Sequence, residues 1–373
     1  MRKPCIAVLG TGSIGKRIID DLLETFDGSV VAIGHSRRSS LKELRKSSKL
    51  ILRTADVLDS SSLLKVLQGV DVVIHAVHHE FNVAVMNACL KTKTHYVDLG
   101  GLYYYTKTQL KLHAKFKQAQ LIAVIGMGAA PGISNILAKY GSRDFDRVTD
   151  IEIRIGVADQ STYRHESPLS APYSIQTLLE ECSWKAAVFR NGRITFREPF
   201  SGRERYKFRE PVGWQKPQFT IHSELATLPK TLRARNVFFK IAFPDSFVKK
   251  IMTLRSIGLL EEKRLPVATA ILKKLPPSIP ERIEQFEIIQ VILRGMRRKK
   301  KSSIRVEAHV PTSGETIDKD TAAPASIVAQ MMLRREWAER GVFAPEEIVP
   351  EELFFRELSH RGIWIYRNSR KIS

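Results

Sequence analysis

Three glycines near the start of the sequence have the spacing that a dinucleotide diphosphate requires. Gly10, Gly12 and Gly15 follow the apolar run CIAVL and lead into RIIDDLL, which has helical periodicity. In this pattern the first glycine makes a tight turn, the second lets a diphosphate approach the backbone, and the third lets helix and sheet pack closely. The following helix would direct its N-terminal amides toward the phosphates. The spacing predicts a nucleotide site, with a purely structural turn as the alternative.

The end of the second apolar run indicates which dinucleotide is bound. An NAD site usually carries Asp or Glu about 20 residues after the glycine loop, whereas the sequence here is VVAIGHSRRSS. Ser36, Arg37 and Arg38 could surround a 2′-phosphate with donors and positive charge, although two arginines are also ordinary in so basic a chain. We therefore expect NADP (NADPH). The remaining residues expected to line the cofactor are Thr11, Ser13, Ile14, Asp56, Val57, Ala76 and Val77. Asp56 could contact the adenine edge or cap a helix, a role for which Asp59 and Ser60 compete.

The elements that must position this loop alternate through the first 130 residues. Short, mostly apolar strands separated by helix-like segments indicate a doubly wound parallel sheet, because strands buried on both faces do not alternate. The expected strands are Cys5–Leu9, Ser29–Ile33, Leu50–Arg53, Asp71–Val77, His95–Leu99 and Leu121–Gly126. The expected helices are Ile14–Thr25, Ser39–Ser47, Ser60–Gln68, Asn82–Lys91 and Lys107–Gln118.

After Asp150 the pattern changes to clustered strands, which predicts a second, α+β domain on a largely antiparallel sheet. The candidate strands are IEIRIGV, AAVF, RITF, QFTIHS, VFFKIAF, EIIQVIL and SIRVEAHV, with helices at YSIQTLLEECSW and DSFVKKIMTLRSIGLL. Asn191-Gly192 is a type I′ hairpin signal. Ala325–Arg340 and Glu351–Leu358 are expected to be helical. We expect domains at 1–130, 131–321 and 322–373, the last packing back on the first.

Composition excludes some classes of protein. The 373 residues include no apolar run near the roughly 20 residues that span a bilayer, and the three cysteines have no ligand or disulfide spacing, which favours a reducing cytoplasm. The 60 Lys and Arg against 39 Asp and Glu give a net charge of +21, which attracts polyanions. The densest run, Arg294–Lys301, lies between two predicted strands, so a solvated hairpin turn is favoured over a nucleic-acid site. We expect no membrane, nucleic-acid or metal partner.

Several longer segments carry a resemblance that spans nearly the whole chain. DVVIHAVHHEFNVAVMNACLKTKTHYVDLGG, LIAVIGMGAAPGISNILA, PASIVAQMML and GVFAPEEIVPEELFFREL resemble the saccharopine dehydrogenase/saccharopine reductase family. The resemblance implies a Rossmann domain, a substrate domain that often dimerises, and hydride exchange between NAD(P) and an imine or secondary amine of an amino-acid or polyamine conjugate. A small-molecule substrate and a homodimer are therefore expected. A non-catalytic NADP-binding sensor or interaction protein of the same fold is the alternative.

Two segments depart from the family pattern. Ala130 stands immediately before Pro131, where saccharopine reductases commonly carry an aspartate, and the polar segment after the fourth strand reads Val77-His78-His79-Glu80. A carboxylate and an amine-type group are thus replaced by a small apolar residue and imidazoles. These departures bear on saccharopine as the substrate more than on the reaction type.

The residues that could manage the proton of such a reaction follow the strand ends. His78 and His79 follow the fourth strand, and imidazole titrates near neutrality; each could instead only hydrogen-bond the cofactor or the backbone. Asp98 ends the fifth strand and could orient a substrate amine or cap the following turn. The loop Gly128–Gly132 could offer free amides to a substrate carboxylate.

The segments that match the family's substrate domain supply the other candidates. Tyr173, at a helix start, could donate to a carboxylate or only pack. His222 and Glu224 share one face if their segment is a strand, and could bind substrate or form a structural hydrogen bond.

Overall fold

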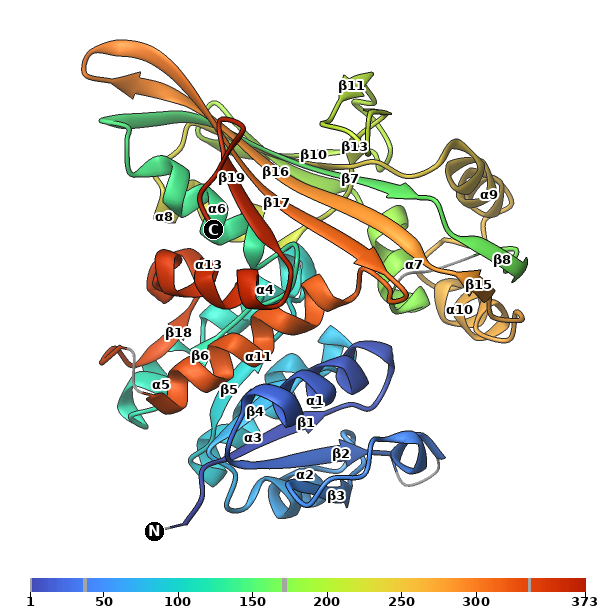
Figure 1. Ribbon diagram of the computed structural model, residues 1–373, viewed down its shortest axis with the longest axis vertical. Helices are drawn as coiled ribbons and strands as arrows, with labels where there is room; N and C mark the ends of the chain where they lie inside the picture. Colours follow the sequence, from blue (N-terminus) through green and yellow to red (C-terminus); the bar gives the residue numbers. More distant parts are fainter. Residues whose placement is uncertain (1, 36–38, 170–172, 335–336) are drawn as a thin grey trace. The chain divides into compact units, whose positions relative to one another are not determined.

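The computed structural model describes residues 2–35, 39–169, 173–334 and 337–373, and the chain forms two compact units (Figure 1). Unit 1 comprises Met1–Ile136 and Asp318–Arg361, and unit 2 comprises Leu137–Ile317 and Gly362–Ser373. The C-terminal segment expected at 322–373 therefore divides. Its first part belongs to unit 1, and its last twelve residues pair with the sheet of unit 2.

Unit 1 contains a seven-stranded sheet in the order β18-β6-β5-β4-β1-β2-β3, in which every pair is parallel. The order reverses at β1 and β4, which is the doubly wound arrangement. The strands are β1 (Cys5–Leu9), β2 (Ser29–Gly34), β3 (Leu50–Thr54), β4 (Val72–His75), β5 (His95–Asp98), β6 (Ile122–Val124) and β18 (Gly341–Phe343). The six strands predicted from the sequence are all present, and the fold class is confirmed. The seventh, β18, was missed because three residues carry too little pattern.

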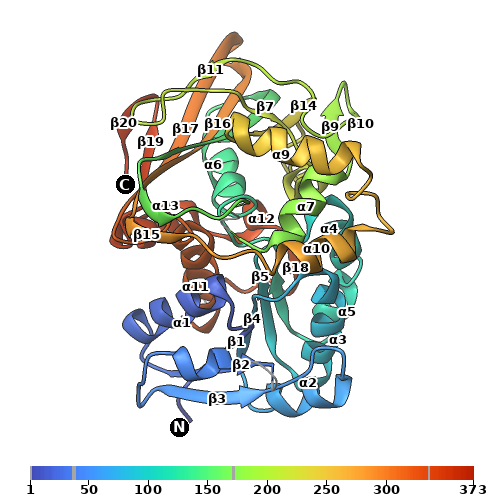
Figure 2. The ribbon, with the colours of Figure 1, turned by 90° about the vertical axis from the view of Figure 1, so that its right-hand side faces the viewer.

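Helices cover both faces of this sheet, with α1 and α11 on one side and α2 and α3 on the other (Figure 2). The helical elements are α1 (Ser13–Thr25), η1 (Ser39–Glu43), α2 (Ser60–Leu67), η2 (His79–Phe81), α3 (Asn82–Thr92), α4 (Leu102–Leu110), α5 (His113–Gln118), α11 (Lys319–Arg334), α12 (Pro345–Ile348) and α13 (Glu351–His360). α6 (Ile133–Ser142) carries the chain from unit 1 into unit 2.

Three helix predictions in unit 1 were wrong in extent. The segment 39–47 forms only the short 3₁₀ turn η1, and the single helix expected at 107–118 is two helices, α4 and α5. α11 begins at Lys319, six residues before the expected start, because Pro324 removes only one backbone hydrogen bond near the first turn. α11 also ends at Arg334, before the expected Arg340. The other helices predicted in unit 1 lie within two residues of their observed bounds, whereas the helix predicted over 245–260 in unit 2 ends four residues early, at Ser256.

Unit 2 is built on a nine-stranded sheet in the order β10-β9-β14-β7-β16-β17-β19-β20, with β13 also paired to β14. Only β14 and β7 run parallel among these pairs, so the largely antiparallel prediction is confirmed. The strands are β7 (Arg147–Asp159), β9 (Ala186–Arg190), β10 (Arg193–Arg197), β13 (Gln218–Phe219), β14 (Asn236–Ile241), β16 (Glu284–Arg297), β17 (Lys300–Ser313), β19 (Trp364–Arg367) and β20 (Arg370–Lys371). Two small ribbons pair β8 (Thr162–His165) with β15 (Ile279–Arg282), and β11 (Tyr206–Lys207) with β12 (Trp214–Gln215).

Both tight turns predicted in unit 2 are two-residue hairpins. Asn191 and Gly192 have φ of 51° and 78° between β9 and β10. In the basic run, Arg298 and Lys299 have φ of 48° and 62° between β16 and β17. Positive φ at both positions defines the type I′ turn, so the turn interpretation of the basic run is confirmed.

The helices that matter for the site of unit 2 cover one face of its sheet (Figure 1). α6 packs there through Gly141, where a Cβ would crowd Leu293 and Val306. α7 (Ile175–Ser183), η3 (Ser223–Ala226) and α8 (Leu228–Thr231) complete this layer, and α9 (Asp245–Ser256) and α10 (Leu265–Leu272) pack with α7. The strand predicted at 218–223 stops at Phe219, because the chain there leaves the sheet edge and turns into η3.

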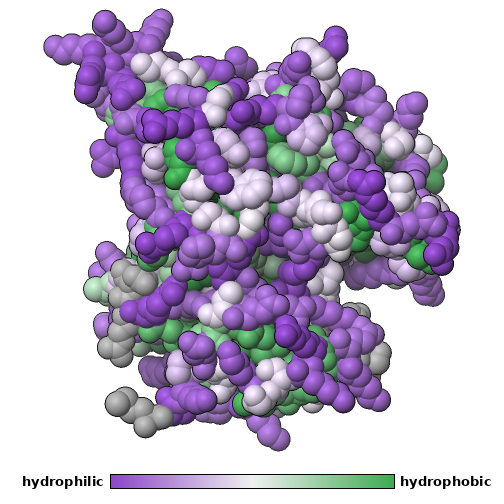
Figure 3. All heavy atoms as spheres, in the orientation of Figure 1, coloured by the Kyte–Doolittle hydropathy of each residue, from purple (hydrophilic) through white to green (hydrophobic). Residues whose placement is uncertain are grey.

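The face drawn in Figure 3 is mostly hydrophilic, as the charge of the chain predicts. No described helix is both long and apolar enough to pass through a membrane. Cys5, Cys89 and Cys182 are buried and free.

Candidate active site

The glycine loop has the shape that a diphosphate needs. Gly10 lies between β1 and α1 with φ of 114°, and a Cβ there would stand 2.6 Å from the carbonyl oxygen of Ala76. A Cβ at Gly15 would overlap the carbonyl oxygen of Gly10, so neither position accepts a side chain. Gly12, the N-cap of α1, has nothing within 4 Å of the place where its Cβ would be. Open space in front of a helix N-terminus is where phosphate oxygens can accept from backbone amides, so the residues present fit a dinucleotide.

Other residues expected around the cofactor lie at the same edge of the sheet. Val77 approaches Gly10 from the end of β4, and Thr11 is buried beside Gly34 of β2. Ser36, Arg37 and Arg38, which carried the 2′-phosphate prediction, lie outside the described residues. The cofactor contacts expected of Ser13, Ile14 and Val57 stay predictions.

Asp56 does not cap a helix. The carboxylate of Asp59 accepts from the backbone N–H of Ser61 at 2.9 Å and is the N-cap of α2. Asp56 instead accepts from the N–H of Leu58 at 2.9 Å, and its Oδ2 lies 3.9 Å from Nε2 of His35. Its contact with adenine stays a prediction.

His75 closes β4 and was not recognised in the sequence as a candidate. Its side chain is 1% exposed, between Leu9 and Asp98 in the register of the sheet. The nearest polar groups are the backbone at His78 and the amide of Asn82, and neither forms a hydrogen bond of ordinary geometry with it among the described residues. Burial lowers the pKa of His75 to about 4, so the imidazole is neutral. A histidine inside the apolar run DVVIHAV was the available signal.

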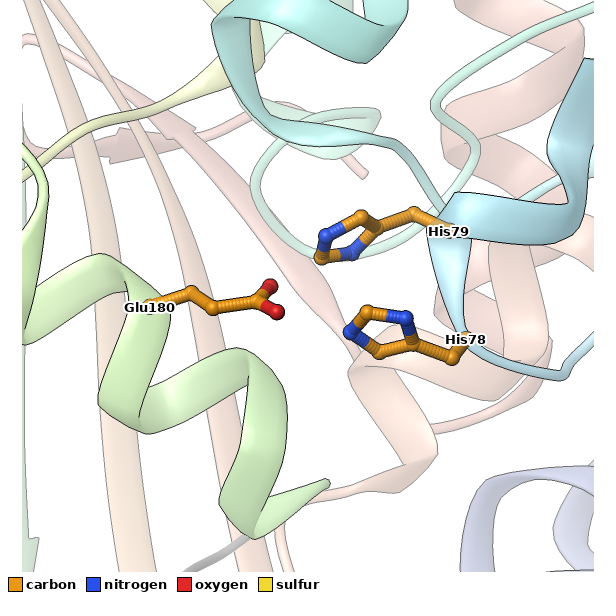
Figure 4. A group of neighbouring side chains, drawn as sticks. All are labelled: His78, His79 and Glu180. Carbon is orange, nitrogen blue, oxygen red and sulfur yellow. The ribbon is translucent and has the colours of Figure 1, made fainter. Parts of the chain in front are cut away.

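His78 and His79 stand side by side where the chain leaves β4 (Figure 4). The ring centroids of the two histidines are 4.0 Å apart. Nδ1 of His78 lies 3.2 Å from Oε1 of Glu80, and the ring of His79 is buried 4.6 Å from that of Tyr105. Both imidazoles are thus held at the carboxyl edge of the sheet, where cofactors bind in this class of fold.

Asp98 is the centre of a buried hydrogen-bond network. Its Oδ1 accepts from the backbone N–H of Gly100 at 2.9 Å and of Gly126 at 2.7 Å, and its Oδ2 accepts from the hydroxyl of Tyr96 at 2.8 Å and from Nε2 of Gln109 at 2.5 Å. Burial raises the pKa of Asp98, and the four hydrogen bonds oppose this rise. A carboxylate has about four acceptor positions, so the geometry favours a positioning role for Asp98 over contact with a substrate amine.

Two glycine amides of the loop 126–133, which the sequence suggested might be free, are used in hydrogen bonds. The N–H of Gly128 donates to the carbonyl of Pro131 at 2.8 Å, and that of Gly132 to Oδ1 of Asn135 at 3.1 Å. The N–H of Ile133 donates to Gly128 at 3.0 Å. The amides of Gly128 and Gly132 are therefore already used within the loop and its following helix, and a role of the loop in holding a substrate carboxylate stays a prediction.

In unit 2 the structure brings Tyr173 and His222 together through a residue that the sequence analysis missed. The hydroxyl of Tyr173 donates to Oε2 of Glu181, whose Oε1 lies 3.9 Å from Nε2 of His222. Nδ1 of His222 lies 3.1 Å from Oε2 of Glu224. The two carboxylates and His222 are buried. The predicted His222–Glu224 pair exists, but it spans the start of η3 rather than a strand. The signal for Glu181 was a pair of acids, Glu180 and Glu181, within the apolar pattern of α7.

The protonation of this group follows from its neighbours. Burial lowers the pKa of His222, but the charges of Glu224 and Glu181 and the hydrogen bond with Glu224 outweigh it, so the net shift is upward. Burial raises the pKa of Glu181, against the effects of His222 and Tyr173. The upward shift of the His222 pKa favours the protonated form of an imidazole that lies between the buried carboxyl groups of Glu181 and Glu224.

A doubly wound sheet with a diphosphate cradle, joined to a second α+β unit, defines a dinucleotide-binding protein of two units. Two family models match nearly the whole chain: the saccharopine dehydrogenase NADP binding domain over residues 6–124, and the saccharopine dehydrogenase C-terminal domain over residues 128–363. The chain belongs to the saccharopine dehydrogenase family. It is an NADP-dependent oxidoreductase that interconverts an imine and a secondary amine, which confirms the cofactor and the reaction class expected from the sequence.

Individual relatives and structures agree with this assignment. The chain is 26% identical over 379 residues to a carboxynorspermidine synthase of Vibrio cholerae, covering 90% of this chain and 85% of the relative. It is 20% identical to a carboxyaminopropylagmatine dehydrogenase of Synechocystis, covering 91% of each. The structure of saccharopine dehydrogenase (L-Glu forming) from Saccharomyces cerevisiae superposes with a TM-score of 0.73 at 16% identity, covering 99% of this chain and 100% of that one, so the fold is shared.

Proposed function

We propose that this chain reduces the imine formed between a polyamine-type amine and a small carbonyl compound that carries a carboxylate. The observation that carries this proposal is the buried group in unit 2, in which Glu181 and Glu224 flank His222. Buried carboxylates are retained where a cation can pair with them, and an amine substrate is a cation at neutral pH. The curated names of two relatives that match over about nine-tenths of the chain support the same substrate class.

The reaction balances with one cofactor molecule. Amine and aldehyde condense to an imine with loss of water; a hydride then adds to the imine carbon and one proton is taken up at nitrogen, giving a secondary amine. NADPH supplies the hydride when bound. We propose that His78 and His79 hold and deliver the proton. Both lie at the carboxyl edge of the sheet, directly after β4, and β4 is the neighbour of β1, the strand that leads into the glycine loop.

The test is NADPH consumption across a matrix of diamines, polyamines and amino acids, each paired with small semialdehydes. We expect turnover with at least one polyamine-type amine. His78→Gln and His79→Gln are each expected to change the affinity for NADPH by no more than about threefold. The variant that removes the proton-handling histidine should lose 100-fold or more in kcat, which is typical of general acid–base catalysis. His360→Gln, an exposed position, is the matched control. NADPH binding without turnover for any pair would instead favour the non-catalytic alternative.

We also propose that the chain is a homodimer. Val267 and Ile271 lie one turn apart on α10 with exposed fractions of 60% and 57%, and Ile279 of β15 is also exposed. Apolar side chains that share a helix face and remain in water are typical of an interface. Sedimentation should show a dimer, and Val267→Glu combined with Ile271→Lys should shift it to a monomer. A wild-type monomer at micromolar concentration would contradict this.

We infer further that the protein works in the cytoplasm. Free, buried Cys5, Cys89 and Cys182 fit a reducing compartment. Cell fractionation that found the protein outside the cytoplasm would contradict this inference.

A further inference from the structure

Gln218 in unit 2 is buried without the hydrogen bonds that its side chain needs. Its exposed fraction is 0%, and neither Oε1 nor Nε2 has a hydrogen-bond partner among the residues that the structure describes. A buried amide that is left unsatisfied destabilises the folded protein. A leucine of nearly the same size would avoid this cost, so the amide needs an explanation outside the described contacts.

Register places the side chain of Gln218 on a known face of the sheet. Gln218 pairs with Ile241 of β14, and paired residues in antiparallel strands point to the same side. Phe239 lies two residues along β14 and therefore shares this side. The ring of Phe239 stacks on His222, with centroids 3.6 Å apart and planes 16° apart. Gln218 thus lies on the face that carries His222.

Thr220 lies between these two residues in the chain and has the same deficit. It is 0% exposed, and its Oγ1 has no hydrogen-bond partner in the described part of the chain. We call Gln218, Thr220 and His222 the polar stripe. Gln218 and Thr220 lie two positions apart, and the side-chain oxygen of each lacks a partner. We take this to indicate one ligand that both oxygens contact, rather than two unrelated unsatisfied groups.

The charged residues around the polar stripe indicate whether that ligand is a cation or an anion. Glu181 approaches His222 from α7, and Glu224 approaches it from η3. Two carboxylates against one imidazole leave a net negative charge, which repels an anion and attracts a cation. A primary ammonium has three N–H donors and no acceptor, and Gln218 Oε1, Thr220 Oγ1 and a carboxylate oxygen of Glu181 are three acceptors.

We propose that the polar stripe, with Glu181, binds the free primary ammonium of the amine substrate, the end that does not react. This inference rests on the proposed function for its substrate class and adds the residues that select it. These side chains would distinguish a diamine from a monoamine, because a monoamine leaves the buried oxygens unsatisfied. A site built to hydrogen-bond a substrate group rejects the analogue that lacks it.

The test compares Gln218→Leu and Thr220→Val with Thr269→Val. Thr269 of α10 is also buried, and its Oγ1 has no hydrogen-bond partner within the described ranges. It lies outside the polar stripe, so it controls for loss of a buried hydroxyl. We expect each stripe variant to raise the KM for a diamine by 10-fold or more. The same variants should change the KM for a monoamine of equal length, and the Kd for NADPH, by less than twofold. Thr269→Val should change none of these.

Thermal unfolding without ligand separates this role from a structural one. Gln218→Leu and Thr220→Val are expected to be as stable as the wild type or more stable, since they remove unsatisfied groups. A large loss of stability in both variants, or an equal rise in KM for the diamine and the monoamine, would overturn the inference. Calorimetric titration of the NADPH-bound enzyme with the diamine covers the case of no turnover. Diamine binding that Gln218→Leu abolishes would support the polar stripe even if reduction failed, and absence of both binding and turnover would overturn it.

Discussion

Oδ1 of Asp98 accepts a hydrogen bond from the backbone N–H of Gly126 at 2.7 Å, joining the end of β5 to the loop after β6. The same oxygen accepts from Gly100, and the second oxygen accepts from Tyr96 and Gln109. One buried carboxylate therefore fixes two glycine turns and the helix α4 at the carboxyl edge of the sheet. Its effect on catalysis would come through the position of these turns.

Asp98→Asn should destabilise the protein. The amide keeps the size of the carboxylate, but one of its two positions becomes a donor that faces donors, so at least two hydrogen bonds are lost. Breaking them in a buried network costs about 2 to 4 kcal/mol. Denaturant unfolding measures the change, and Asp27→Asn, at a fully exposed position, is the control. Equal stability of the two variants would contradict the network.

Gly12→Ala and Gly15→Ala should separate cofactor binding from folding. At Gly12 a Cβ meets nothing within 4 Å, so the alanine variant should unfold at the wild-type temperature while its Kd for NADPH rises 10-fold or more. At Gly15 a Cβ overlaps the carbonyl of Gly10, so that variant should lose stability even without cofactor. Thermal scans and NADPH fluorescence titration measure both. Wild-type NADPH affinity in Gly12→Ala would place the diphosphate elsewhere.

The parts of the fold that were predictable have strong local patterns. β1 is five consecutive buried apolar residues before a glycine loop, and this short length together with the flanking glycine favours a strand over a helix. β18 is only Gly341–Phe343, and it pairs with β6 across more than 200 residues of chain. Nothing local identifies such a strand. QFTIHS has the alternation of a strand, but only Gln218 and Phe219 pair with β14, and His222 stacks on Phe239 after the strand has ended.

His75 should make stability fall at acid pH. Its pKa is near 6.5 in the unfolded chain and about 4 in the folded protein, because burial disfavours the charged imidazole. The unfolded state therefore binds the proton first, and stability is lost as pH falls from about 6.5 toward about 4 and levels off below. The fall is worth about 3 kcal/mol at its limit.

The measurement is the difference in unfolding free energy between wild type and His75→Leu, taken at about pH 7.5 and about pH 4.5. Subtraction removes the acid groups that both proteins share. The wild type should lose about 2 kcal/mol more than the variant over this range. A difference independent of pH would mean that His75 is not buried in its neutral form.

Candidate site residues were predictable where chemistry and position coincide. His78 and His79 are polar residues directly after a buried strand, and the sequence places them at the correct edge. The bridge between Tyr173 and His222 was not predictable, because Glu181 lies on α7, 41 positions before His222 in the sequence. Long-range packing alone brings them together. The hydrogen bonds within the loop 126–133 likewise involve Asn135 and the loop's own carbonyl groups, and no pattern in the sequence predicts them.

Replacing the tip of the basic hairpin should stabilise the protein without affecting its function. Arg298 and Lys299 adopt positive φ, which costs residues with a Cβ about 1 kcal/mol or more each. Arg298→Asn with Lys299→Gly supplies the pair that type I′ turns favour, so the free energy of unfolding should rise by about 1 kcal/mol. NADPH oxidation should be unchanged.

The same double substitution also removes two positive charges from the run Arg294–Lys301. Filter binding with RNA at low and moderate salt should give the same retention as the wild type. A salt-sensitive loss of RNA affinity in this variant would instead identify the hairpin as a polyanion site, since such binding scales with the number of phosphates neutralised.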